Sequence, residues 1–312
     1  MKILFMGTPE FAVPILESLC KEDKHEVLAV VCQPDRPKGR GKSVIFPPVK
    51  EFAIKHDIPV LQPEKVRKND SFVEELSAIG ADIFVVVAYG QILPLRILNI
   101  PPLGCINIHA SLLPKYRGAA PMQWAILNGE KETGITIQYM DKGMDTGDMI
   151  LKRAIPIEEN DCFEDIHDKM SALSCECIFE ALDQIAAGTA NREPQNHDEA
   201  TYAPMLKKEN GLIDWGNSAI SIYNQFRALN PWPGTYTHYD GQVLKIWECS
   251  VESENIAENA VPGQVLEASK HLLVKCGEGS LKITMLQGQG SKRMDAADYL
   301  RGRAIPVGAI LL

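Results

Sequence analysis

Short apolar runs alternate with amphipathic stretches along the first 140 residues of the chain. Runs of strand length, rich in β-branched and other apolar residues, occur at 2–6, 26–32, 82–88, 105–109 and 134–140. The stretches between them have apolar residues three and four positions apart, as amphipathic helices do, at 11–21, 47–56, 71–80 and 120–129. Strands that alternate with helices predict an α/β domain, Rossmann-like, with an open parallel-rich sheet.

The pattern changes beyond residue 140. Residues 148–157 predict a further strand, and 163–188 predict one long helix that ends at Gly188. The polar stretch 189–204 shows neither periodicity nor an apolar face, which is typical of a linker. Short alternating strands separated by turn residues follow it, at 243–249, 263–269, 271–276 and 280–288. We therefore expect a first domain over 1–188, a linker over 189–204, and a small OB-like β-barrel over 205–312.

Composition narrows the class of protein. With 312 residues, 45% of them hydrophobic and 23% charged, the chain is long enough for two globular domains, and disorder, collagen and coiled coil are excluded. No window approaches 20 uninterrupted apolar residues, so no membrane span is expected. The N-terminal apolar run is interrupted at Gly7 and Pro9, so no signal peptide is expected either. The eight cysteines include no CxxC pair and lie mostly among apolar neighbours, which favours a reducing cytoplasm.

The formal charge is unevenly distributed. Residues 1–204 carry the whole net charge of −9, and residues 205–312 balance to zero. An acidic surface repels phosphate, so the overall charge disfavours non-specific binding of nucleic acid, although a local basic patch can override it.

The first predicted strand-to-helix turn bears on nucleotide cofactors. A dinucleotide fold carries G-x-G-x-x-G there, but only Gly7 is present, followed by Thr8 and Pro9. Because the pattern GxxxxGK[ST] is also missing, NAD, FAD and nucleoside triphosphates are poor candidates. Gly7 alone is explained by a tight turn.

The segment 105–148 carries the candidate chemistry. Asn107 and His109 alternate along a predicted strand, so both side chains leave the same face near its carboxyl end, where open α/β sheets bind ligands. An amide donor beside an imidazole can stabilise an oxyanion and assist proton transfer, and Asp145 lies in the loop after the next strand. Taken alone, each residue also fits a structural role: His109 as a core histidine, Asn107 at a strand end, and Asp145 in a turn.

The same segment resembles a known family. An Asn-x-His strand, a Ser-Leu-Leu-Pro turn and an aspartate in a later loop are the hallmark of the formyltransferases that use 10-formyltetrahydrofolate. The matching positions are Asn107, His109, Ser111, Leu112, Leu113, Pro114 and Asp145. Further motifs match over almost the whole chain, including MGTPEFAVPILESL, QPDRPKGRGK, VVVAYGQILP and FRALNPWPGTY. The last of these lies in the second domain, and it directs the resemblance to the members that act on initiator methionyl-tRNA.

The resemblance implies roles for individual residues. It makes Asn107, His109 and Asp145 catalytic. It assigns contacts with the folate co-substrate to two segments: Val87, Ala88, Tyr89, Gly90, Ile92 and Leu93 in the first, and Ser111, Leu112, Leu113 and Pro114 in the second. From the residues alone, a buried strand and a pocket wall look the same in the first segment.

A basic segment follows Cys32. Arg36, Lys38, Arg40 and Lys42 stand within eight residues of Asp35, carried on Gly39 and Gly41, which allow unusual backbone dihedrals. From the residues alone a solvated charge run is the simpler explanation of this segment, whereas the resemblance implies contact with the acceptor arm of tRNA. In the second domain, basic pairs at Lys207 with Lys208 and at Lys292 with Arg293 are the candidate tRNA contacts, although a tRNA-binding module is expected to be basic rather than neutral.

The implied reaction is transfer of a formyl group to the amino group of the methionine on initiator methionyl-tRNA. No metal is needed, and we expect a cytoplasmic monomer with no membrane association and no protein partner. Two other hypotheses remain open: a formyltransferase acting on a sugar-nucleotide amine, and a catalytically idle tRNA-binding protein on the same fold.

Overall fold

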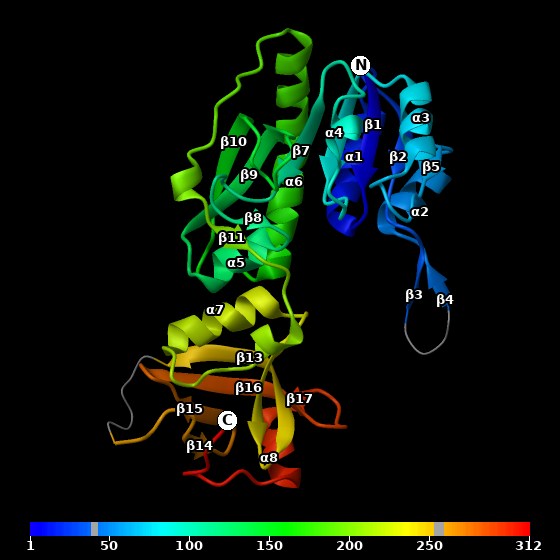
Figure 1. Cartoon of the computed structure of the whole chain (residues 1–312). Helices are drawn as coiled ribbons and strands as arrows, with labels where there is room; N and C mark the ends of the chain where they lie inside the picture. The colour runs from blue at the N-terminus through cyan, green and yellow to red at the C-terminus, as the bar shows by residue number, and fades with distance from the viewer. Residues whose placement is uncertain (39–42, 253–258) are drawn as a thin grey trace. The chain divides into compact units, whose positions relative to one another are not determined.

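The computed structural model describes residues 1–38, 43–252 and 259–312. The chain divides into two compact units, which are described separately here (Figure 1). The first unit comprises residues 1–121, 132–156 and 166–203, and the second comprises 122–131, 157–165 and 204–312. The domain limits at 188 and 204 stay predictions, but residues 189–203 group with the first unit.

A seven-stranded sheet forms the centre of the first unit. Its order is β10 (Met149–Pro156), β9 (Glu132–Tyr139), β7 (Cys105–His109), β6 (Ile83–Val87), β1 (Lys2–Gly7), β2 (Glu26–Val31) and β5 (Val60–Leu61). The strands from β7 to β5 are parallel, whereas β9 runs antiparallel to β7, and β10 antiparallel to β9. The predicted parallel-rich sheet is confirmed, with the antiparallel pair at one edge.

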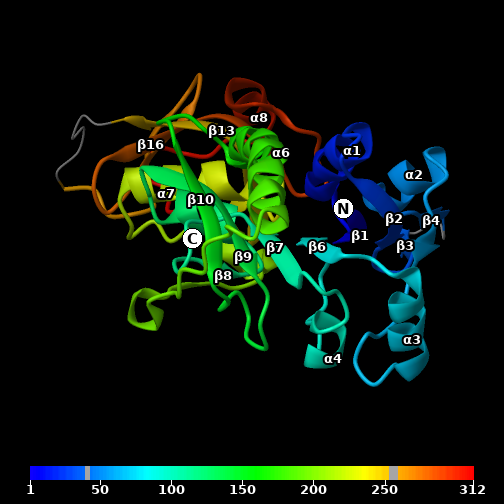
Figure 2. The same ribbon diagram turned by 90° about the horizontal axis from the view of Figure 1, so that it is seen from above.

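Helices cover both faces of this sheet. Figure 2 shows α1 (Val13–Lys21) and α6 (Phe163–Ala186) on one side, and α3 (Asp70–Ile79) and α4 (Leu95–Leu98) on the other. The alternation in β1 explains the two layers, because Leu4 and Met6 pack in one apolar cluster with Phe72 and Leu76 of α3, and the intervening residues point to the opposite face. The helix predicted over 47–56 is confirmed as α2 (Pro48–Lys55).

The second unit is an antiparallel sheet, as predicted for the barrel domain. Its path runs β12 (Thr235–Tyr239), β13 (Gln242–Glu252), β16 (Ser280–Gly288), β15 (Leu272–Lys275) and β14 (Val265–Ala268), and β17 (Met294–Asp295) pairs with β16. No predicted element corresponds to β12, α7 (Ala219–Leu229) or α8 (Ala296–Gly302). Trp215 lies in the apolar core of this unit and donates from Nε1 to Oγ1 of Thr237 at 2.9 Å.

Several short elements complete the fold. They include β3 (Arg36–Lys38) with β4 (Ser43–Ile45), β8 (Arg117–Gly118) with β11 (Tyr202–Ala203), α5 (Pro121–Leu127), and the 3-10 helices η1 (Glu10–Ala12), η2 (His197–Glu199) and η3 (Lys208–Gly211). Of these, only α5 and η1 coincide with predicted helices. All eight cysteines are free. Among the residues that the structure describes, no helix is long and apolar enough to cross a membrane.

Candidate active site

The strand β7 brings two polar side chains to the carboxyl edge of the sheet. Asn107 and His109 are 9% and 6% exposed, and they alternate on one face as their spacing predicted. In the antiparallel register with β9, Asn107 lies opposite Gln138, and His109 lies opposite Thr136. A cluster of polar side chains is therefore built into the interior of the sheet.

Asp145 joins this cluster from the loop after β9. Its Oδ1 lies 3.4 Å from Nδ2 of Asn107 and 3.7 Å from Nδ1 of His109. Its Oδ2 accepts a hydrogen bond of 2.9 Å from the backbone N–H of Gly118. The Asp145 backbone has a φ of 56°, in the left-handed region that non-glycine residues seldom adopt. The three residues predicted as catalytic are thus in mutual reach.

Both ring nitrogens of His109 face oxygen atoms. Nε2 lies 3.0 Å from the carbonyl oxygen of Tyr116, and Nδ1 faces the Asp145 carboxylate. A neutral imidazole has one N–H, so it can donate to only one of the two oxygens, whereas an imidazolium can donate to both. The arrangement accommodates a ring that gains and loses a proton without turning.

The turn over 111–114 is hydrogen-bonded to Thr136 of β9. Oγ1 of Thr136 donates to the carbonyl oxygen of Ser111 at 2.7 Å and accepts from the N–H of Leu113 at 3.1 Å. Oγ of Ser111 donates to the carbonyl oxygen of Lys115 at 2.6 Å. Ser111 and Leu113 are buried, whereas Leu112 and Pro114 are half-buried. Of the four predicted folate contacts in the turn, these last two are the more accessible.

The predicted folate segment after β6 separates into two sets. Val87, Tyr89 and Leu93 are buried, whereas Ala88, Gly90 and Ile92 are exposed. The carbonyl oxygen of Tyr89 accepts from Oγ1 of Thr8 at 2.9 Å, and burial raises the pKa of the Tyr89 hydroxyl. The structure therefore leaves positions 88, 90 and 92 available to a ligand and uses the others for packing.

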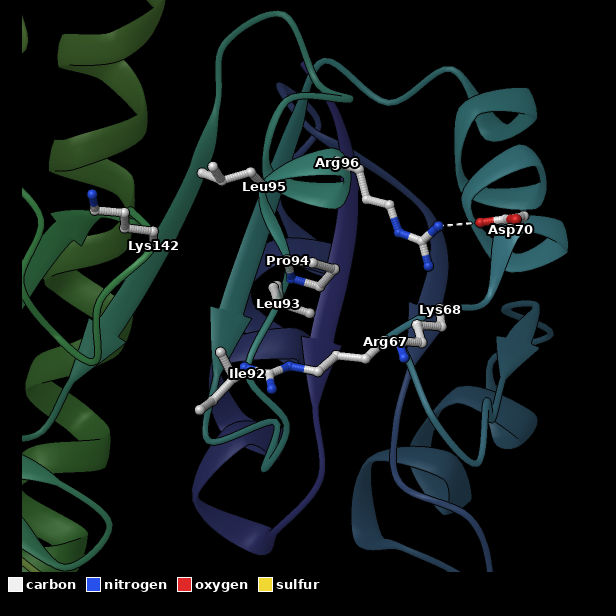
Figure 3. Close-up of a pocket in the computed structure, with 9 residues that line it drawn as sticks. All are labelled: Arg67, Lys68, Asp70, Ile92, Leu93, Pro94, Leu95, Arg96 and Lys142. Atoms are coloured by element: carbon white, nitrogen blue, oxygen red, sulfur yellow. Dashed lines mark hydrogen bonds and ion pairs between the residues drawn. The ribbon is translucent and has the colours of Figure 1, made fainter.

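A basic pocket opens beside this segment (Figure 3). Its volume is about 530 Å³, and its lining consists of Arg67, Lys68, Asp70, Ile92, Leu93, Pro94, Leu95, Arg96 and Lys142. Figure 3 shows Arg67 extended toward Ile92, and Arg96 turned to Asp70, with which it forms an ion pair. The lining thus has four cationic side chains and one carboxylate, and Lys142 comes from the loop that carries Asp145.

Comparison with known proteins identifies the family of the chain. A family profile described as formyl transferase matches residues 1–182, and one described as the formyl transferase C-terminal domain matches residues 205–304. The methionyl-tRNA formyltransferase of Caldanaerobacter subterraneus subsp. tengcongensis is 53% identical over 311 residues, which cover 100% of both chains. The chain belongs to the methionyl-tRNA formyltransferase family. The enzyme of the same name from Geobacter sulfurreducens is 51% identical over 100% of this chain and 96% of its own.

Solved structures share the fold of this family member. The N-formyltransferase from Helicobacter canadensis, in complex with folinic acid and dTDP-3-aminofucose, is 21% identical, with a TM-score of 0.65 over 91% of this chain and 98% of its own. HypX from Aquifex aeolicus, in complex with tetrahydrofolic acid, is 20% identical, with a TM-score of 0.61 over 96% of this chain. The chain spans about half of HypX, since the match covers 47% of that protein.

The described residues predicted to bind tRNA lie in a hairpin of the first unit and at two places in the second unit. Arg36 is exposed on β3, Lys38 ends that strand, and Arg40 and Lys42 lie outside the described residues. Next to the hairpin of β3 and β4, Asp35 accepts a hydrogen bond of 2.8 Å from Gln62 and forms an ion pair of 2.6 Å with Lys50. These interactions lower the pKa of Asp35, and the hydrogen bond from Gln62 contributes most. In the second unit, Lys207, Lys208, Lys292 and Arg293 are exposed, and the Arg293 guanidinium lies 5.1 Å from the centre of the Trp247 ring.

Four residues of the site were missed in the sequence. Gly118 and Gln138 donate directly to Asp145, Gln138 from Nε2 to Oδ1 at 3.4 Å. Gln195, from the segment predicted as a linker, donates to the carbonyl oxygen of Asp145, and Arg117 of β8 donates to Gln195; both side chains are buried. Only Gln138 left a signal: a glutamine two residues after a threonine in the apolar strand GITIQYM indicates a polar stripe on one face.

Proposed function

We propose that the chain transfers the formyl group of 10-formyltetrahydrofolate to the amino group of methionine on initiator methionyl-tRNA. The observation that carries the proposal is the placement of one carboxylate oxygen of Asp145 within 3.4 Å of the Asn107 amide and 3.7 Å of the His109 ring. Acyl transfer to an amine needs a donor for an oxyanion and a group that moves a proton, and this cluster has both.

In the proposed reaction, the nitrogen lone pair of the methionyl amine forms a bond with the formyl carbon, and the carbonyl π electrons move to oxygen. The amide of Asn107 and an N–H of His109 stabilise that oxyanion, each by roughly 3 kcal/mol when well placed. Collapse of the tetrahedral intermediate breaks the bond between the formyl carbon and N10, and tetrahydrofolate leaves.

The proton lost by the amine must reach N10 of the departing folate. Asp145 accepts it through a water molecule, and the neighbouring His109 ring supplies the second site of the relay. The Tyr116 carbonyl oxygen, 3.0 Å from Nε2, keeps the buried His109 ring in one orientation, so the N–H that it offers to the oxyanion is the one at Nδ1.

The folate is held by two walls in this proposal. The exposed positions Ala88, Gly90 and Ile92 form one wall, and the turn at Leu112 and Pro114 forms the other. A pterin needs a mainly apolar slot with a few polar contacts. The cations Arg67 and Lys142 of the adjoining pocket suit the carboxylates at the other end of a folate.

The tRNA is bound by basic side chains on both units. Arg36, Lys38, Arg40 and Lys42 take the acceptor arm, while Lys207, Lys208, Lys292 and Arg293 bind phosphates elsewhere. Because these side chains neutralise phosphates, affinity for tRNA falls steeply with salt. A monomer acting in the cytoplasm completes the proposal, and its eight free cysteines support a reducing compartment.

The deciding experiment supplies purified protein with 10-formyltetrahydrofolate labelled in the formyl group and, separately, four acceptors: methionyl initiator tRNA, methionyl elongator tRNA, uncharged initiator tRNA and a sugar-nucleotide amine. We expect label on the charged initiator alone. If no RNA is labelled and a sugar-nucleotide amine is, the acceptor in the proposal is wrong and the catalytic cluster stands. If folate binds and no acceptor is labelled, the chain is an idle tRNA-binding protein.

A further inference from the structure

The segment predicted as a linker is attached to the catalytic cluster. Its end, β11, pairs in parallel with β8, with Tyr202 opposite Arg117 and Ala203 opposite Gly118, whose N–H donates to Asp145. Earlier in the segment, Glu193 and Met149 exchange backbone hydrogen bonds of 2.8 and 3.0 Å. Between these two attachments lies Gln195, which is only 6% exposed.

The Gln195 amide nitrogen is surrounded by acceptors of the active-site loop. Nε2 donates to the carbonyl oxygens of Asp145 at 2.9 Å and Gly147 at 2.8 Å. It also lies 3.1 Å from Oε1 of Gln138, the residue whose own Nε2 donates to the Asp145 carboxylate. One side chain thus contacts the loop on both sides of Thr146 and the strand beneath it.

Arg117 fixes which way the Gln195 amide faces. Its Nε and Nη2 lie 3.1 and 2.6 Å from Oε1 of Gln195, and its Nη2 also lies 3.0 Å from Nδ1 of His197. A guanidinium has only donors, so the amide oxygen must face Arg117 and the NH2 group must face the loop carbonyls. Because Arg117 is 2% exposed, solvent does not compete for this interaction.

The conformation of the 145–147 loop depends on these hydrogen bonds. Asp145 has a positive φ, and a Cβ on Gly147 would lie 1.7 Å from the carbonyl oxygen of Tyr139, so the chain passes through a narrow space here. Strained backbone persists where the surrounding structure determines it. Without Gln195, two loop carbonyls would have no side-chain donor, and the backbone that aims the Asp145 carboxylate would be free to relax.

We infer that Gln195 is a positioning residue for the reaction, which holds the carboxylate of Asp145 toward Asn107 and His109 through the carbonyls of the 145–147 loop. The inference rests on the proposed function, since it assumes that Asp145 moves the proton. Gln195 does not touch substrate; its effect is on the geometry of the residue that does.

The test uses the full chain and two variants. Gln195→Glu keeps an acceptor for Arg117 but cannot donate to the loop carbonyls, and Gln195→Met keeps the volume without either bond. We expect each to lower kcat roughly 10- to 100-fold, as displacement of a catalytic group by about 1 Å does. KM for the folate and for charged tRNA should stay within about twofold of the unchanged chain. Asn196→Ala, one residue on and exposed, is the matched control and should keep full kcat.

A double-mutant cycle separates positioning from mere folding. In an Asp145→Asn background, Gln195→Glu should change the residual kcat by less than about threefold, because the group that it positions is already gone. An equal reduction of kcat in both backgrounds, or unchanged kcat in both Gln195 variants, overturns the inference. If Gln195→Glu does not fold, as judged by its thermal midpoint, Gln195→Met carries the same cycle. Failure of the unchanged chain to formylate any acceptor would instead overturn the proposed function.

Discussion

Asn107 and Gln138 stand opposite each other in the register of β7 and β9, and both amides reach Oδ1 of Asp145 at 3.4 Å. The pairing of two strands thereby fixes two donors to a carboxylate that arrives on a separate loop. Since the backbone N–H of Gly118 holds Oδ2, both carboxylate oxygens are oriented before any substrate binds. Such orientation in advance is what lowers the barrier of an acyl transfer.

Removing the charge of Asp145 should abolish most of the activity. For Asp145→Asn we expect kcat to fall by about 100- to 10,000-fold, because the amide cannot take up the proton of the attacking amine. Single-turnover transfer of labelled formyl measures the chemical step. Asp148→Asn makes the same change three residues on and should leave the rate near that of the unchanged chain. A near-normal rate for Asp145→Asn would remove it from the mechanism.

We expect Asn107 to act as a hydrogen-bond donor, and not only through its shape. We expect Asn107→Ala and Asn107→Asp each to lower kcat by about 100- to 1000-fold, because neither can donate to the oxyanion. The same single-turnover transfer of labelled formyl measures the effect. The aspartate has nearly the shape of the asparagine, so retention of activity by Asn107→Asp alone would show that shape, and not donation, is required.

The basic pocket should report on the carboxylates of the folate. For Arg67→Ala we expect KM for 10-formyltetrahydrofolate to rise roughly two- to fivefold, as is usual when one exposed ion pair is removed. With a 10-formyl pteroate derivative that lacks the glutamyl carboxylates, the variant and the unchanged chain should have equal KM values. Lys65→Ala, which removes a nearby cation that does not line the pocket, is the control. If Arg67→Ala and the unchanged chain also have equal KM values for 10-formyltetrahydrofolate, the folate carboxylates bind elsewhere.

The basic segment should govern the response to tRNA and not to folate. For the double variant Arg40→Ala with Lys42→Ala we expect a higher KM for charged tRNA at unchanged KM for folate. The slope of log affinity against log salt should become shallower by about 0.7 to 0.9 for each phosphate that is no longer neutralised. Lys55→Ala on α2 controls for a general decrease in positive charge. An unchanged salt slope would contradict the role given to these two side chains.

Asp35 should make stability depend on acid pH. Hydrogen bonds from Gln62 and Lys50 lower its pKa in the folded chain, so its contribution is present above the unfolded value and is lost as pH falls through the folded one. We expect Asp35→Asn to lower the urea midpoint at pH 7, and the difference from the unchanged chain to shrink below about pH 3.9. A difference that stays constant from neutral pH down to about pH 3 would mean that the carboxylate charge is not what Gln62 and Lys50 recognise.

Much of the fold could be predicted because its elements depend on local patterns. The IFVVV run of β6 and the three-and-four spacing in α6 appear in the sequence whatever their neighbours are. The common face of Asn107 and His109 followed from the two-residue period of a strand. The folate segment could not be resolved in the same way, because Ala88 has a φ of 47° and the strand period ends there. Burial at Tyr89 and exposure at Ile92 depend on that turn.

Gln195 could not be predicted at all. Its hydrogen-bond partners are 48 to 78 positions away in the chain, and its neighbours in sequence are exposed polar residues. A buried glutamine in a polar stretch has the same local pattern as a solvated one. Such residues are found only when the strands that surround them have been placed.

The pairing of β11 with β8 determines where the first domain can be separated from the rest of the chain. A first domain excised at residue 188 would retain Asn107, His109 and Asp145, but it would lack Gln195, β11 and the bonds that they make to Arg117 and the 145–147 loop. We therefore expect that a first domain must extend to Ala203 to keep these bonds. Gene fusions that exchange the second domain are expected to preserve activity when they join after that residue and to abolish it when they join before Gln195.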